Sequence, residues 1–302
     1  MRRKVKNTQN RMNEHSVLIA DSGSTKTNWC LVDGELAPRH FNTEGYNPFF
    51  VDSAYITNSL RSNFPSDFAY HSIKEVHFYG AGCQDSKIDV VKNALRDTFP
   101  NATLAAEGDL LGAARGLLDE SPGFAAILGT GMNTCLYDGK RITKNIESLG
   151  FLLGDEGSGT DIGRHILADY IRGKMPARVS ELFYDVYRMS PEETMSEVYG
   201  HKLPNRFCAS FTKFLKHPEI ELDYTNAIVS KCFNSFFTNL VSSYPDYQSY
   251  TFNCLGSVGY HFSDILRQTA LSFGMKTGKI IPGLIDDLVL YHRKAEKLSS
   301  AY

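Results

Sequence analysis

The stretch VLIADSGSTKTNWCLVDG, residues 17–34, decides how the rest of the chain is interpreted. Its apolar start, residues 17–20, predicts a short buried strand, and residues 27–32 predict a second strand that ends at a turn, Asp33-Gly34. The connecting segment 21–26 offers bendable backbone, hydroxyl groups, an ammonium group and a carboxylate. These groups suit a polyphosphate and Mg²⁺, although an ordinary polar hairpin would contain them too.

A second segment, residues 124–139, repeats this order of apolar run, glycine turn and strand. Its turn is GTG at 129–131, and it also ends in Asp-Gly. The two segments superpose at an offset of 105 residues, which aligns Asn28 with Asn133 and Thr25 with the threonine of GTG. This similarity indicates an internal duplication into two lobes, each opened by a hairpin with a polar tip, unless two common hairpins match by chance.

Patterning along the remaining chain predicts alternating helices and strands at first, and mostly helices later. In the first part we expect helices at 51–63, 86–98 and 108–118 and strands at 75–79 and 102–106. In the second part we expect helices at 161–172, 179–188, 191–199, 206–215, 224–243, 262–273 and from 284, and strands at 250–255 and 277–281. The chain thus divides into a disordered basic tail (1–15), an N-terminal lobe (16–118) and a C-terminal lobe with a helical insertion (119–302), whose last helix can pack back on the first lobe.

Composition excludes several classes of protein. The 302 residues are 42% hydrophobic and 22% charged, which is typical of a globular chain. A net charge of −2 provides no general positive field for nucleic acid. The chain has no apolar stretch approaching the roughly 20 residues of a membrane span. The six cysteines lie far apart without a C-x-x-C motif, which predicts free thiols in a reducing, cytoplasmic compartment.

Four motifs in order carry a family resemblance, whereas the Walker and dinucleotide-binding glycine motifs are absent. D-x-G-x-T-K at 21–26, G-T-G at 129–131 and G-S-V-G at 256–259 resemble the phosphate-1, phosphate-2 and adenosine motifs of the superfamily that joins actin, hexokinase and the heat-shock chaperone ATPases. LGFLLGDEGSG at 149–159 is similar to the BadF/BadG/BcrA/BcrD ATPase family and its N-acetylglucosamine kinase members. The resemblance implies an α/β fold of two ribonuclease-H-like lobes, a duplicated actin-like ATPase fold with a nucleotide cleft between them and a helix-rich second lobe.

Asp109 is the predicted catalytic residue. It follows the strand 102–106 and opens the helix 108–118, at a strand's carboxyl end, where open α/β sheets bind ligands. A simple helix cap is the alternative reading. The resemblance implies that Asp109 is the general base that accepts the proton of a sugar hydroxyl.

The resemblance implies roles for further residues. Asp21 would hold Mg²⁺ through water. Residues implied to bind the ATP phosphates are Gly23, Ser24, Thr25, Lys26, Gly129, Thr130 and Gly131. Residues implied to bind adenosine are Gly256, Ser257 and Gly259. Residues implied to bind the sugar are Asn47, Asp109, Thr130, Asp155 and Glu156.

Two of the sugar-site assignments have structural alternatives. The amide of Asn47 can donate and accept, as vicinal hydroxyls require, but Asn and Pro are also ordinary turn residues. The segment 154–158 could equally form the start of a helix, where serine and acidic residues are common.

These features predict an ATP- and Mg²⁺-dependent kinase that phosphorylates a hydroxyl of an amino sugar, most specifically N-acetylglucosamine to its 6-phosphate. Its partners would be the sugar and ATP, without nucleic acid or membrane, and a homodimer is compatible with the family. One alternative is the dimeric activase of 2-hydroxyacyl-CoA dehydratases or benzoyl-CoA reductases, which holds an iron–sulfur cluster through cysteines. Cys83 and Cys135, in or directly after predicted strands, make that alternative weak. The other is a nucleotide sensor without transferase activity, against which Asp21, Lys26 and Asp109 argue together.

Overall fold

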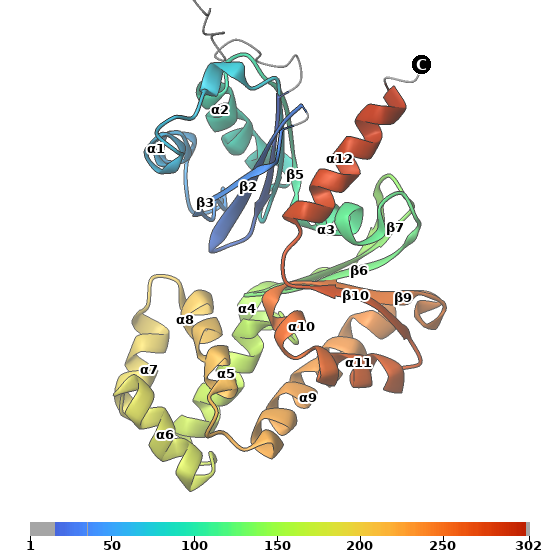
Figure 1. Cartoon of the computed structure of the whole chain (residues 1–302). Coiled ribbons are helices and arrows are strands. Elements are labelled where there is room, and N and C mark those ends of the chain that lie inside the picture. Colours follow the sequence, from blue (N-terminus) through green and yellow to red (C-terminus); the bar gives the residue numbers. More distant parts are fainter. Residues whose placement is uncertain (1–15, 35, 300–302) are drawn as a thin grey trace, which may run out of the picture. The chain divides into compact units, whose positions relative to one another are not determined.

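In the computed structural model, residues 16–34 and 36–299 are described, and the chain divides into two compact units. Unit 1 ends at Gly112 and resumes at Leu284, and unit 2 is Ala113–Gly283 (Figure 1). The predicted basic tail, 1–15, lies outside the described residues. The division between the units falls within the helix Asp109–Leu118, and the final helix is grouped with unit 1.

Unit 1 is built on a mixed five-stranded sheet with strand order β3-β2-β1-β4-β5. Its strands are β1 (Ser16–Ser22), β2 (Lys26–Asp33), β3 (Arg39–Glu44), β4 (Glu75–Gly80) and β5 (Thr103–Gly108). The first three strands form an antiparallel meander, and β4 and β5 run parallel to β1. The apolar residues of β1 are buried, as their unbroken hydrophobic pattern predicts for a central strand.

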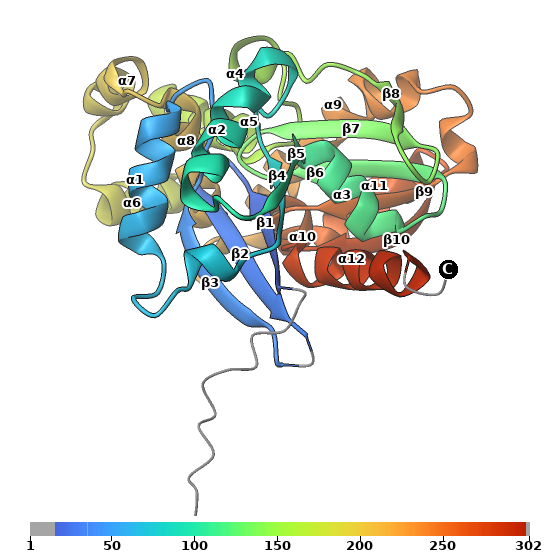
Figure 2. The ribbon, with the colours of Figure 1, turned by 90° about the horizontal axis from the view of Figure 1, so that it is seen from above.

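Four helices belong wholly or partly to unit 1: α1 (Ser53–Asn63), α2 (Ile88–Thr98), α3 (Asp109–Leu118) and α12 (Ile285–Ser299). Figures 1 and 2 show α1 and α2 on one side of the sheet and α12 on the other, where α12 contacts β1 and β2. The predicted helices and strands of this part are confirmed to within two residues. The apolar groups between α1, α2 and the sheet form the core of the unit.

Unit 2 repeats the sheet of unit 1 with the order β10-β9-β6-β7-β8. Its strands are β6 (Gly123–Leu128), β7 (Met132–Tyr137), β8 (Ile142–Asn145), β9 (Thr251–Leu255) and β10 (Lys276–Ile281). Again the first three strands are antiparallel and the last two run parallel to the first. The two sheets therefore have one topology, which confirms the internal duplication predicted from the paired hairpins.

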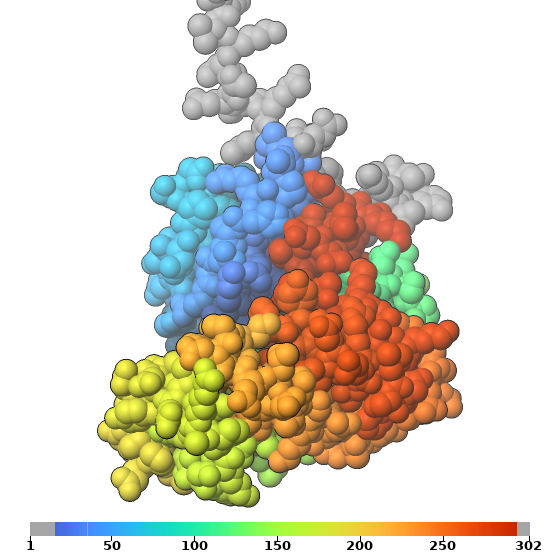
Figure 3. All heavy atoms as spheres, turned by 60° about the horizontal axis from the view of Figure 1, so that its bottom comes forward, coloured from blue at the N-terminus to red at the C-terminus, as the bar shows by residue number. Residues whose placement is uncertain are grey.

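The helices of unit 2 lie mostly between β8 and β9, which confirms the predicted helical enrichment. That connection contains α4 (Gly150–Leu153), α5 (Gly159–Ile171), α6 (Ala177–Tyr187), α7 (Pro191–Gly200), α8 (Pro204–Ser210) and α9 (Leu222–Asn239). Between β9 and β10 follow α10 (Ser257–His261) and α11 (Ser263–Ser272). Much of the face of unit 2 in Figure 3 is formed by the yellow and orange segments of the first connection. Their buried apolar side chains pack on the sheet in one core.

Two features bear on the classes considered above. Among the helices of the described residues, none combines the length and the apolar character needed to cross a membrane. All six cysteines are free thiols and buried.

Candidate active site

Two carboxylates meet at the carboxyl ends of the parallel strands of unit 1. Asp21 is near the end of β1, and Asp109 follows β5 as the first residue of α3. Between them, Gly80 of β4 is paired with Ser22 and with Gly108. A Cβ at Gly80 would lie 2.9 Å from the sulfur of Cys83 and closer still to the ring of Phe78, so the middle strand needs glycine at this position.

Both carboxyl groups have perturbed acidity. Burial raises the pKa of Asp109 to about 6, against the effect of hydrogen bonds from backbone N–H groups, including the one that Leu110 donates over 2.8 Å. Burial and the nearby charge of Asp109 raise the pKa of Asp21 to about 6 as well, although Asn28 and the backbone of Leu284 oppose the shift. A partly buried pair of interacting carboxylates is typical of a functional site, because the paired charges favour a bound cation or proton.

The phosphate-turn residues predicted in unit 1 lie together in the β1–β2 hairpin. Gly23 donates its N–H to the carbonyl of Lys26 over 3.0 Å, which closes the turn. Thr25 and Lys26 are exposed. The turn therefore presents its hydroxyl and ammonium groups to the surface of the unit rather than to its core.

Gly45 supports this turn from the segment after β3. Its N–H donates to the carbonyl of Thr25 over 3.1 Å. A Cβ at Gly45 would lie 2.6 Å from the carbonyl carbon of Ser24 and 2.7 Å from the amide nitrogen of Thr25, and closer still to the carbonyl oxygen of Gly23. Real Cβ atoms do not approach backbone atoms so closely, so only glycine fits behind the turn.

The predicted sugar residue Asn47 lies two residues beyond this glycine. Its Oδ1 accepts a hydrogen bond from the N–H of Phe49 over 3.0 Å, which is a local side-chain turn. The same oxygen lies against Gly82, where an added Cβ would be 2.5 Å away. The structure therefore brings Asn47 next to the small-residue loop after β4. The carboxylate of Glu44, just before Gly45, accepts hydrogen bonds from the hydroxyls of Tyr55 and Ser59, which fix the start of the segment that contains Asn47.

In unit 2 the phosphate-2 loop, Gly129-Thr130-Gly131, connects β6 and β7 and is fastened to the start of α5. The N–H of Gly159 donates to the carbonyl of Gly129 over 2.8 Å. The N–H of Thr160 donates to the carbonyl of Thr130 over 3.0 Å, and its Oγ1 donates to the same carbonyl over 2.6 Å. The first-turn N–H groups of a helix lack intrahelical partners, and here two of them hold this loop.

Asp155 packs directly against the same loop. Its Oδ1 accepts from the N–H of Met132 over 3.2 Å, and its carboxylate would be 3.1 Å from a Cβ at Gly131. Asp155 has a positive φ of 57° and is buried, which raises its pKa to about 6 although Met132 and Arg164 oppose the shift. Two predicted sugar-site residues, Asp155 and Thr130, therefore lie on two loops of unit 2 that contact each other. Glu156 turns elsewhere and accepts a hydrogen bond from Asn239 over 2.9 Å.

The predicted adenosine motif begins beside the phosphate-2 loop. Gly256 has a φ of 124°, and a Cβ there would lie 2.7 Å from the carbonyl carbon of Leu128 and 3.2 Å from the amide of Gly129. Ser257 is exposed at the first position of α10, whereas Gly259 is buried against Cys254. Gly256 therefore needs both its backbone conformation and its missing side chain for packing within unit 2.

The residues that support the two turns from behind were not predicted. Gly45 lies behind the first turn, and Thr160 behind the second. The sequence contained a local indication for Thr160. Ser158 is the N-cap of α5 and accepts a hydrogen bond from the N–H of Asp161. The residues that follow an N-cap have N–H groups without intrahelical partners, so these groups can bind a neighbouring loop. No local signal distinguishes Gly45 from any other turn glycine.

The repeated mixed sheet of both units, with polar turns after the first strand of each, is that of the ATPase superfamily that includes actin and hexokinase. Comparison with solved structures agrees. A protein from Porphyromonas gingivalis, provisionally named an N-acetylglucosamine kinase, superposes with a TM-score of 0.86 at 36% identity, covering 92% of this chain and 99% of that one. A second protein with the same provisional name, from Chromobacterium violaceum, has a TM-score of 0.66 at 15% identity, with 92% and 98% covered.

A glucokinase of the ROK family from Streptomyces griseus, solved with glucose and AMPPNP, has the same fold, with a TM-score of 0.55 at 14% identity and coverage of 92% of this chain and 99% of that one. No family model and no curated protein matches the sequence. The similarity to the Porphyromonas protein nonetheless extends over nearly the whole of both chains. The chain belongs to the N-acetylglucosamine kinase-like group of the BadF/BadG/BcrA/BcrD ATPase family, a group of ATP-dependent sugar kinases.

Proposed function

We propose that this protein transfers the γ-phosphoryl group of ATP to a hydroxyl of an amino sugar, N-acetylglucosamine in the first place, to form its 6-phosphate. The observation that carries the proposal is the pair of partly buried, interacting carboxylates, Asp21 and Asp109, at the carboxyl ends of parallel strands. The name of the Porphyromonas neighbour supports the choice of sugar.

Asp109 is proposed as the general base. A carboxylate with a pKa of about 6 is ionised at neutral pH and still basic enough to accept a proton as the hydroxyl attacks phosphorus. Its position is fixed because Asp109 is the first residue of α3 and its Oδ1 accepts a hydrogen bond from the N–H of Leu110. Most of the remaining catalysis would come from alignment of the phosphates and from charge stabilisation.

Asp21 fits a site for Mg²⁺. Its carboxylate oxygens are hard ligands. Burial and, after it, the charge of Asp109 raise its pKa, so a divalent cation would relieve the repulsion between the two carboxylates. Bound Mg²⁺ would neutralise charge on the phosphate oxygens. The residues proposed to hold the phosphates are the turn at 23–26 in unit 1 and the loop 129–131 in unit 2, so substitutions in either unit should reduce turnover.

Replacing Asp21 with alanine should weaken the apparent affinity for Mg²⁺ by about 10–100-fold, the usual cost of losing a group that orients a metal or its water. The measurement is the rate of ADP release at fixed ATP as Mg²⁺ is varied. The control is Asp67→Asn, an exposed carboxylate of unit 1 that pairs with Arg39. An unchanged Mg²⁺ dependence in Asp21→Ala would remove this residue from the metal site.

The rate should also depend on pH in a defined direction. Because the pKa values of Asp109 and Asp21 are both raised to about 6, both carboxylates are ionised well above that pH and become protonated below it. We therefore expect kcat/KM to be level at neutral pH and to fall as the pH drops through about 6, with apparent pKa values that belong to the pair. A profile that stays flat through this range at saturating Mg²⁺ would contradict the role of the pair.

The activase alternative finds no support in the cysteines. Cys83 and Cys135 are buried, and burial raises the pKa of each thiol to about 12. Within the described residues, neither thiol belongs to a group of three or more His, Cys, Asp or Glu side chains placed to hold a metal.

The experiment that tests the proposed function is a coupled assay of ADP release with Mg-ATP against a panel of amino sugars and plain hexoses. Stimulation by one N-acetylated sugar, with formation of its phosphate, is the expected result. ATP binding without stimulation by any sugar would favour a sensor, and the proposal would then fail.

A further inference from the structure

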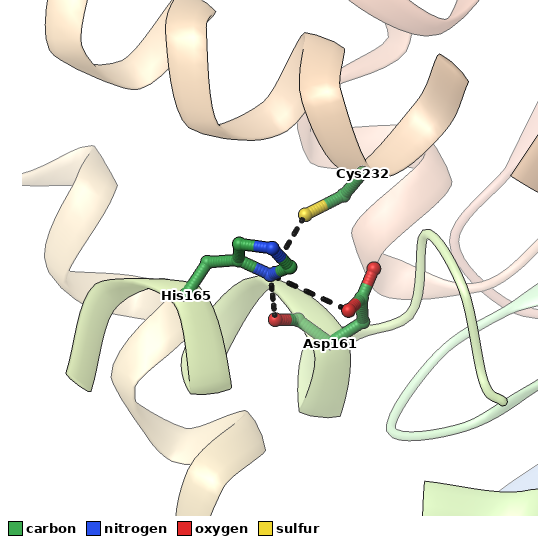
Figure 4. Close-up of side chains that lie close together, drawn as sticks. All are labelled: Asp161, His165 and Cys232. Carbon is green, nitrogen blue, oxygen red and sulfur yellow. Dashed lines mark hydrogen bonds and ion pairs between the residues drawn. The ribbon is translucent and has the colours of Figure 1, made fainter. Parts of the chain in front are cut away.

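Three side chains with different metal-ligating atoms meet in unit 2, outside the residues assigned above. Asp161 and His165 lie one turn apart on α5, and Cys232 comes from α9 (Figure 4). Their ligand atoms, a carboxylate oxygen, Nδ1 and Sγ, all lie within 4.8 Å of one another. Within residues 16–34 and 36–299 no other group of three His, Cys, Asp or Glu side chains satisfies this condition.

Two of the three distances between the ligand atoms match edges of one coordination tetrahedron. Nδ1 of His165 is 3.4 Å from Oδ1 of Asp161 and 3.6 Å from Sγ of Cys232. Tetrahedral Zn²⁺ with ordinary bond lengths would separate its nitrogen and oxygen ligands by about 3.4 Å and its nitrogen and sulfur ligands by about 3.6 Å. Figure 4 shows the imidazole of His165 joined by dashed lines to the carboxylate of Asp161 and to the sulfur of Cys232.

The ligands are already oriented by other groups. Oδ2 of Asp161 accepts from the N–H of Gly157 over 3.0 Å, and its Oδ1 accepts from Arg164 over 3.2 Å. A carboxylate oxygen has a second lone pair, so the bond from Arg164 leaves Oδ1 able to bind a cation. Such outer contacts to Asp161 are typical of metal sites because they hold a ligand in register. Nδ1 of His165 also lies 3.0 Å from the backbone oxygen of Asp161, a contact in which the Nδ1–H group donates. Zn²⁺ must therefore displace the proton of this nitrogen as well as that of the Cys232 thiol.

Solvent can reach the three-residue cluster mainly on the side of His165. The side chain of Asp161 is 5% exposed and Cys232 is fully buried, whereas the side chain of His165 is 31% exposed. An ion and one water ligand could therefore enter beside the imidazole.

We propose that Asp161, His165 and Cys232 form a three-residue site for Zn²⁺, with water as the fourth ligand. A set of one oxygen, one nitrogen and one sulfur suits this borderline-soft ion and disfavours Mg²⁺, which prefers oxygen ligands. The ion would fasten α5 to α9. Since the first N–H groups of α5 hold the loop 129–131, the site would stabilise that loop from behind.

The test uses the full-length protein, treated with chelator and titrated with Co²⁺ in the absence of nucleotide. One equivalent of Co²⁺ per chain should produce tetrahedral visible bands and a thiolate-to-metal charge-transfer band, and Zn²⁺ should displace it. Co²⁺ bound elsewhere through oxygen alone, for example at Asp21, gives no charge-transfer band. The signal therefore reports on the cysteine and does not depend on kinase activity.

Two variants decide the assignment. Cys232→Ser should abolish the charge-transfer band, and His165→Asn, at the partly exposed position, should weaken Co²⁺ binding by more than about 100-fold, since loss of even an outer partner costs 10–100-fold. Cys30→Ser is the matched control. Cys30 is also a buried thiol beside a histidine, with Sγ 3.8 Å from Nε2 of His40, which lies 3.6 Å from Asp286.

Retained binding in Cys30→Ser, together with loss in the two cluster variants, would support the site. The proposal is overturned if stoichiometric Co²⁺ gives no charge-transfer band in the unaltered protein, or if the band survives in Cys232→Ser. Should that variant fail to fold, as judged by circular dichroism, normal Co²⁺ affinity in folded His165→Asn overturns it equally. In each of these cases the three residues are a hydrogen-bonded packing contact.

Discussion

Replacing Asp109 with asparagine should lower kcat by about 10²–10⁴-fold, the usual contribution of general-base catalysis. The substitution keeps the size of the side chain and its ability to accept the hydrogen bond from the N–H of Leu110. It removes the group that accepts the hydroxyl proton. The residues proposed to hold the phosphates, 23–26 and 129–131, are not altered, so kcat should fall far more than ATP affinity. The measurements are steady-state ADP release with the preferred sugar and calorimetric binding of ATP.

The control for this variant is Asp52→Asn. Asp52 is the N-cap of α1, and its Oδ1 accepts from the N–H of Tyr55 over 2.8 Å. Asparagine is as good an N-cap as aspartate, so this control should keep both its stability and its activity. If Asp109→Asn also turned over at a near-normal rate, Asp109 would be only a helix cap and the proposed base would be wrong.

Replacing Gly45 with alanine should lower kcat/KM for ATP by about 10²-fold, because a displacement of about 1 Å in a positioning element can cost that much. The added Cβ would overlap the backbone of Ser24 and Thr25, and backbone atoms cannot move aside as a flexible side chain can. The turn proposed to hold the phosphates must then shift as a whole. The loss should appear mainly with ATP as the varied substrate, while the sugar dependence at saturating ATP changes less.

Gly200→Ala provides the matched control, because a Cβ at that position meets nothing within 4 Å. It should leave both kinetic constants unchanged. Melting temperatures of the two variants separate a shifted turn from general unfolding. Normal ATP kinetics in a folded Gly45→Ala variant would show that the turn tolerates displacement and does not position the phosphates.

Most of the fold could be predicted from the sequence, with two informative omissions. The strands β3 and β8 were not expected, because both are short edge strands whose residues are largely exposed and lack an apolar pattern. Two predicted helices were also too long at one end. The expected helix 206–215 divides into α8 and a 3₁₀ segment, Phe211–Lys216, and the expected helix 224–243 ends as α9 at Asn239. Apolar periodicity continues through such short breaks, so it does not reveal them.

The sequence by itself determined the local chemistry of this protein. Apolar runs followed by glycine turns located the hairpins at 21–26 and 129–131, the constant offset between them revealed the duplication, and Asp109 was placed where a strand ends and a helix begins. These signals are readable because strand and turn propensities depend on neighbouring residues. Only the tertiary structure decided that Gly45 lies behind the first turn, that Thr160 holds the second, and that Cys232 meets the histidine of α5. Those contacts join residues far apart in the chain, and they depend on how whole elements pack, which no local pattern encodes.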